Sequence, residues 1–423
     1  MKNKGKSIPN IPTSAASSPN GSTRVAFMDN LRYLMIVLVV LYHAAAAYAI
    51  VAPHWAVHDT SAVSADIIRE LFDVFLMPIL FFAAGYFALP SLIKKGTWGF
   101  IKEKAVRLLI PWALAVLIVL PLALYDQPVK PVRPFWNYWL HYLASFEVRL
   151  RYSQTPAGIT TQAIYWFLSL LFVFFVVFAL GHGLVRRLRG NAPLAVPGQA
   201  PTGKSVLTAV LVFGVLSSIA YLILLLLVPD SSWFTFFMFM EFQVTRLVPY
   251  TGCFALGVYA QSRGWFSTGK PLGSLIVWGV VSAVLAVAYL VVGQPVFADT
   301  AGTASFSALY LLVFAFLRSF LLLALLVALV SFGIRCWNRT SGFDRQLSST
   351  SFNIYLVHFF IVLIFQGALV QWVGGPVAAK IAIVFLGALG MSYALSRWIL
   401  SRHARAFSFV ILALFVFCLI VRP

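Results

Sequence analysis

Residues 29–50 read DNLRYLMIVLVVLYHAAAAYAI, and the interpretation of the whole chain starts from this stretch. Asp29 and Arg32 open it, ten uncharged residues follow, and His43 lies within the apolar part. On a helix, eleven residues at about 100° each return to within roughly 20° of the start and rise about 16 Å, so Arg32 and His43 share one face. Ionisable side chains inside a membrane segment usually face the protein interior and indicate function. The alternative is that Arg32 reaches the lipid headgroups and His43 is a packing residue.

The composition is typical of a protein that crosses a membrane many times. Of the 423 residues, 61% are hydrophobic and 10% are charged, whereas a soluble domain carries about 25% charged residues. Repeated uncharged runs of about 20 residues predict an all-α fold, a polytopic transmembrane helical bundle of about 10–11 helices. The net charge of +19 comes from short loops, where Lys and Arg fix orientation and meet lipid headgroups, so we expect membrane lipids as partners and no nucleic acid. The three cysteines are scattered, so we predict no metal site.

The predicted spans alternate with loops that differ in basic charge. We place eleven spans at residues 30–50, 67–89, 106–125, 162–184, 206–228, 243–261, 272–293, 306–333, 351–373, 377–399 and 406–422. Every even-numbered loop holds Lys or Arg, whereas all odd-numbered loops except 126–161 hold none. By the positive-inside rule the N-terminus is cytoplasmic, with a disordered tail at 1–24 and a transmembrane domain at 25–423. Eleven spans put the C-terminus outside, and ten put it inside.

Polar residues interrupt these spans in several places. Lys104 and Arg107 are neighbours on one face at the entry to the third span. Ser351, Tyr355 and His358 form one polar stripe on the ninth span, which we expect to face the bundle interior. Charge anchoring and polar contacts between helices are the alternatives to a functional role. A dispersed set, explained equally well by paired buried charges, surface anchors or substrate contacts, comprises Arg69, Glu70, Asp73, Glu241, Arg246, Arg318 and Lys380.

Acyl transfer to a hydroxyl is the chemistry that fits these groups best. A histidine such as His43 in a dry site can act as a general base on an alcohol near neutral pH. Arg32, Lys104 and Arg107 can hold the phosphates of a coenzyme A thioester, whose tail then runs about 16 Å inward to His43. Direct pairing of Asp29 with His43 is not expected, because the two lie about 21 Å apart along one helix.

Five motifs in order resemble the membrane-bound acyltransferase-3 family. These are Arg32 with His43, the stretch MPILFFAAGYF with Phe81, Phe82 and Gly85, the run from Lys104 through Arg107 to Pro111, the segment Tyr165-Trp166-Phe167-Leu168, and the late set Ser351, Tyr355 and His358. FLMPILFF with His54 and Trp55 is similar to the glucan biosynthesis protein C-like branch. The chain departs from the family where Ala84 replaces a frequent serine and in its eleventh span.

The resemblance implies an integral-membrane O-acyltransferase in the cell membrane, most simply a bacterial inner membrane. The donor is a cytoplasmic acyl-CoA as co-substrate with no bound cofactor, and the acceptor is a glycan or lipid-linked sugar that receives an acetyl or succinyl group. It marks His43 and Arg32 as catalytic and Lys104 and Arg107 as acyl-CoA contacts. It gives supporting roles to Asp29, Trp166, Ser351, Tyr355 and His358. The alternatives are a transporter or flippase that uses the buried charges as a relay, and a regulatory protein that has lost activity.

Overall fold

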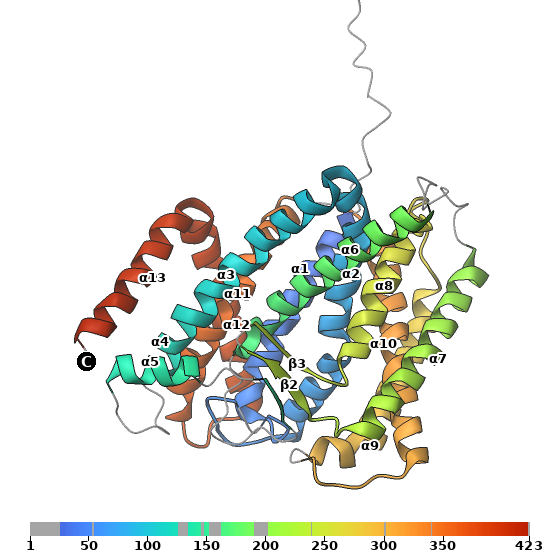
Figure 1. The fold of residues 1–423 in the computed structure, drawn as a ribbon. Helices are drawn as coiled ribbons and strands as arrows, with labels where there is room; N and C mark the ends of the chain where they lie inside the picture. The colour runs from blue at the N-terminus through green and yellow to red at the C-terminus, as the bar shows by residue number, and fades with distance from the viewer. Residues whose placement is uncertain are drawn as a thin grey trace, which may run out of the picture.

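The chain forms a bundle of helices with one small sheet in a computed structural model (Figure 1). The structure describes residues 26–52, 55–125, 134–144, 148–151, 162–189, 202–237, 239–299, 302–339 and 341–421. The predicted tail at 1–24 and His54 lie outside these ranges. The α-helices are α1 (Ala26–Ala44), α2 (Val63–Lys104), α3 (Ile110–Leu114), α4 (Leu120–Leu124), α5 (Phe135–Ala144), α6 (Trp166–Arg189), α7 (Gly203–Leu227), α8 (Leu247–Ser262), α9 (Leu275–Ala298), α10 (Ala308–Cys336), α11 (Gly342–Val370), α12 (Val377–Ala394) and α13 (Ser401–Val421). Short 3₁₀ or π-helical turns are η1 (Ala46–Tyr48), η2 (Ala105–Leu109), η3 (Ala115–Val119), η4 (Ala163–Tyr165) and η5 (Leu395–Leu400).

Eight helices of the described chain are long and apolar enough to cross a membrane, which confirms the predicted polytopic helical bundle. The count is below the predicted eleven because of how the segments join. The second and third predicted spans form one run, Val63–Leu122, which bends at Gly96 where φ is +70°. The sixth predicted span is only the 16-residue helix α8. The last predicted span falls in α13, whose apolar part is Phe409–Cys418.

Helix α1 lies at the centre of the bundle, because it is apolar on most of its surface and must be covered on several sides. It packs against α2, α10, α11 and α12. Figure 1 shows α13 at one side of the molecule and α7 with α9 at the other, with α1 between them. The residue types of the first span therefore place Asn30 and His43 inside the protein.

Helices α2 and α8 approach each other so closely that only glycine fits at the crossing. A Cβ on Gly85 would lie 2.2 Å from the Phe254 carbonyl oxygen, and a Cβ on Gly257 would lie 2.1 Å from the Phe82 carbonyl oxygen. Small residues at a helix crossing let two backbones come into contact. The glycine of the second sequence motif thus has a packing role.

The sheet is antiparallel with the order β1 (Arg149–Arg151), β2 (Trp233–Phe236) and β3 (Met240–Gln243). Trp233 pairs with Gln243 across the hairpin, and Arg151 pairs with Trp233 on the other side. This sheet was not expected from the sequence, because its strands have only three or four residues and lie almost wholly in segments predicted as loops. The hairpin brings Trp233 and Gln243 to the site described next.

Candidate functional site

The site is built on the last turn of α1, which ends directly after His43. Gln366 of α11 fixes this end, since its Nε2 donates to the carbonyl oxygens of His43 at 3.0 Å and Ala44 at 3.1 Å. Its Oε1 accepts a hydrogen bond of 2.7 Å from Nε1 of Trp55. The Trp55 ring stacks on the His43 imidazole with centroids 5.3 Å apart and an interplanar angle of 16°. One buried amide therefore caps the helix and positions the ring that covers the histidine.

A second histidine sets the proton arrangement of the first. His43 Nδ1 lies 3.1 Å from His358 Nε2, and both residues are buried. His358 Nδ1 lies 2.8 Å from the Tyr355 carbonyl and 3.1 Å from the Ile354 carbonyl. A carbonyl only accepts, so we assign the His358 proton to Nδ1, which leaves Nε2 of the neutral ring as an acceptor. His43 Nδ1 then donates to it, and His43 Nε2 keeps a free lone pair that suits a general base.

A cavity of about 270 Å³ adjoins His43 at the end of α1 that is remote from Arg32. Aromatic and charged side chains line it together. The aromatic residues that could stack on a sugar ring are Tyr42, Trp55, Trp166, Trp233 and Tyr250, and the charged residues are Arg69, Glu70, Asp73, Asp230, Arg246 and Asp299. A mixture of apolar rings and a few convergent polar groups is typical of a small-molecule site.

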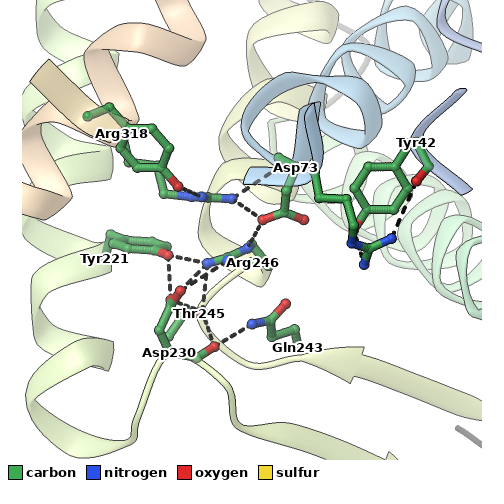
Figure 2. A network of polar contacts seen from close by, with 10 residues as sticks. Tyr42, Asp73, Tyr221, Asp230, Gln243, Thr245, Arg246 and Arg318 are labelled. Carbon is green, nitrogen blue, oxygen red and sulfur yellow. Dashed lines mark hydrogen bonds and ion pairs between the residues drawn. The ribbon is translucent and has the colours of Figure 1, made fainter. Parts of the chain in front are cut away.

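An ion-pair network forms one wall of this cavity (Figure 2). Arg246 donates from Nε to Asp73 at 2.8 Å and grips Asp230 with two nitrogens at 2.8 and 3.0 Å. Arg318 also donates to the Asp73 carboxylate, at 2.7 Å. The hydroxyl of Tyr221 donates to Asp230 at 2.6 Å. Burial raises the pKa of Asp230, but Arg246 and Arg318 lower it further, to about 2. Two arginines are thus neutralised by two aspartates, which ties α2, α8 and α10 together.

A protein-family model described as an acyltransferase domain, the acyltransferase-3 model, matches residues 25–422. The chain belongs to this family. No curated protein and no solved structure gave a match. Membership makes the chain a membrane acyltransferase, while the likeness to the glucan biosynthesis protein C-like branch stays a prediction.

The predicted donor contacts of this acyltransferase lie away from His43. Arg32 approaches Asp29 at 3.6 Å and Ser348 of α11 at 3.4 Å, and its side chain is 36% exposed. Lys104 lies over the rings of Phe100 and Phe175, 5.2 and 5.0 Å from their centroids. Arg107 is exposed on η2. The start of α1 and the end of α2 lie at the same end of the bundle (Figure 1). The acyl-CoA role of these residues stays a prediction.

The predicted supporting residues fall into two groups. Trp166 lines the cavity and stacks on Tyr250, and His358 contacts His43 directly. Ser351 instead donates to the Ser348 carbonyl of its own helix, and the Tyr355 hydroxyl donates to the Ile164 carbonyl, which ties α11 to η4. Neither of the second pair lines the cavity, and Tyr355 is the one that connects α11 to another element.

Sequence reasoning missed Gln366 and Tyr42 and left Arg69 in the dispersed set. The signal for Gln366 was an amide within the apolar run of the ninth predicted span, where a buried polar group needs partners. Trp55 and Tyr42 carry no such signal, since aromatic rings are ordinary in membrane helices and loops. Within the described ranges, no cluster of three metal-ligating side chains occurs.

Proposed function

We propose that the chain is an O-acyltransferase that moves an acetyl or succinyl group from acyl-CoA to a hydroxyl of a cell-envelope glycan, such as a glucan or a lipid-linked sugar. The observation that carries the proposal is the hydrogen-bonded pair His43–His358 beside a cavity lined by aromatic rings, in a chain of an acyltransferase family. The His43 Nε2 lone pair removes the hydroxyl proton as the hydroxyl oxygen attacks the thioester carbonyl.

The donor enters from the opposite end of α1 in this scheme. Arg32, Lys104 and Arg107 hold the phosphates of coenzyme A at the cytoplasmic side, where the positive-inside rule puts the N-terminus. The pantetheine arm extends about 16 Å along α1, so the thioester carbon reaches His43. The acceptor occupies the cavity, and the protein acts in the cell membrane, most simply a bacterial inner membrane.

The helix end at His43 supports the base role. The C-terminal end of a helix carries a partial negative charge, which favours a cation near it. The imidazolium that forms when His43 takes the proton is such a cation. Trp55 and His358 hold the ring in one orientation, so the proton transfer needs no rearrangement of the base.

The test is acyl transfer by the purified protein in lipid nanodiscs. Radiolabelled acetyl-CoA and succinyl-CoA serve as donors, and an envelope glycan fraction serves as acceptor. We expect label in the glycan with the wild type and none with His43→Ala, whereas His141→Ala, a control on the exposed face of α5, keeps the full rate. Mass spectrometry of envelope glycans from cells with and without the chain then identifies the group. Equal transfer by His43→Ala, or movement of a substrate without consumption of acyl-CoA, would refute the proposal.

A further inference from the structure

Arg69 of α2 lines the same cavity as His43. Its guanidinium carbon lies 4.2 Å from the centroid of the Tyr42 ring. One terminal nitrogen donates to the Tyr42 hydroxyl at 3.1 Å, and the other approaches the Tyr42 carbonyl at 3.4 Å. The Nε of Arg69 is buried and has no hydrogen-bond partner. The Nε of Arg318 shares this state, and what distinguishes Arg69 is its place in the wall of the cavity and its charge balance.

The neighbouring arginines differ from Arg69 in their charge balance. Arg246 pairs with Asp73 and Asp230, and Arg318 pairs with Asp73. Among the described residues, no carboxylate oxygen lies within ion-pair distance of Arg69. Arg246 and Arg318, in contrast, each have a carboxylate oxygen within 3.0 Å. Of these three arginines, Arg69 is therefore the one whose charge is not neutralised by a direct ion pair with a described carboxylate.

Tyr42 places this charge beside the base. The Tyr42 ring packs edge-to-face against the His43 ring, with centroids 5.1 Å apart. The Arg69 guanidinium lies over the face of the same Tyr42 ring. The last carbonyl oxygens of α1 accept hydrogen bonds from Arg69 and Gln366, so this end of the helix offers acceptors rather than N–H donors. A negative charge that develops next to His43 thus requires a side-chain donor.

We propose that Arg69 is a second catalytic residue, which stabilises the oxyanion of the tetrahedral intermediate in acyl transfer. This inference rests on the proposed function. The acceptor oxygen forms a bond to the thioester carbon, the carbonyl π pair moves to its oxygen, and His43 Nε2 takes the hydroxyl proton. Arg69 donates to the resulting oxyanion. The carbonyl then re-forms, the carbon–sulfur bond breaks, and the imidazolium returns its proton to the coenzyme A sulfur.

The experiment compares the maximal rate and the apparent KM of Arg69 variants in the nanodisc assay with radiolabelled acetyl-CoA and the envelope glycan fraction, each varied in turn. Loss of one oxyanion donor lowers kcat by about 10²–10³ in other enzymes. We expect Arg69→Gln to lose about 100-fold in maximal rate with little change in either apparent KM, and Arg69→Lys to lose less. Guanidinium ion in millimolar amounts should restore part of the rate of Arg69→Ala and none of the rate of His43→Ala.

The matched control is Arg263→Gln. Arg263 also lies over a tyrosine ring, 5.4 Å from the Tyr259 centroid, and it follows the end of α8 that is remote from the cavity. It should keep the wild-type rate. A maximal rate of Arg69→Gln within about threefold of wild type, or a loss that guanidinium leaves unchanged and that follows a lower unfolding temperature, would overturn the inference. A wild-type protein that transfers no acyl group would instead refute the proposed function. If Arg69→Gln does not fold, Arg69→Lys and the rescue of Arg69→Ala decide the question.

Discussion

In the assigned arrangement His358 accepts the Nδ1 proton of His43, so replacing His358 tests the tautomer without changing the base itself. In His358→Phe, the Nδ1–H of His43 loses the acceptor that lies 3.1 Å away in the wild type. A buried donor without a partner costs about 1–3 kcal/mol. The imidazole avoids this cost by moving its proton from Nδ1 to Nε2. Nε2, which faces the acyl acceptor, then carries a proton and cannot act as the general base. The productive tautomer then becomes less populated by a factor of about 5–150.

The assay is the initial rate of label transfer from acetyl-CoA to the envelope glycan fraction at saturating donor. We expect the initial rate of His358→Phe to fall by about 5–150-fold, since only the tautomer preference is lost. The rate of His43→Ala should fall by about 10²–10⁴-fold, because general-base catalysis is lost. His358→Gln offers an acceptor oxygen to Nδ1 and should recover part of the rate. His141→Phe on α5 is the control, and thermal unfolding monitors the fold. A full rate in His358→Phe together with an inactive His43→Ala would refute the tautomer assignment.

Three further predictions concern stability, measured as the unfolding temperature in detergent. In Gly257→Ala the new Cβ would lie 2.1 Å from the backbone of α2, so the substitution should destabilise the protein by about 1–3 kcal/mol or prevent folding. The control Gly279→Ala, whose Cβ meets nothing within 4 Å, should leave the unfolding temperature unchanged. Equal effects of the two substitutions would contradict the close crossing of α2 and α8. Asp230→Asn should cost about 3–5 kcal/mol by removing one of the two carboxylates that neutralise the buried Arg246 and Arg318. The pKa of Asp230 is about 2, below its ordinary value near 3.9, so the stabilisation is complete above about pH 4 and is lost as the pH falls toward 2. The gap between wild type and Asp230→Asn should therefore narrow only below about pH 4, and a gap that closes near pH 6 would contradict the assigned pKa. Asp59→Asn should leave the buried Lys380, 2.6 Å away, unpaired, so adding Lys380→Met should restore stability; additive losses would show that the pair is not coupled.

The sequence predicted the class of the fold well, because uncharged runs of membrane length allow only a helical bundle. It did not predict that α2 continues as one helical run past Gly96 or that α8 has only 16 residues. These differences depend on which neighbours cover each segment, and hydropathy along the chain does not contain that information.

The sequence also named both His43 and His358 but not their contact. The two are 315 residues apart, and only the packing of α11 against α1 brings them to 3.1 Å. For Asp73, Arg246 and Arg318, the structure shows paired buried charges, one of three alternatives that the sequence left open. Charge pairing between distant helices cannot be read from spacing, because many arrangements of the same helices satisfy the same hydrophobic pattern.

The position of the cavity at the opposite end of α1 from Arg32 has a consequence for inhibitors. A compound that contacts Trp55, Trp166 and Arg69 in the cavity would not overlap the place where the phosphates of coenzyme A are proposed to bind. Its inhibition should be competitive with the glycan and noncompetitive with acyl-CoA. A nucleotide analogue bound at Arg32 should show the reverse pattern, and a molecule that joins the two would have to span about 16 Å, the rise of eleven helical residues.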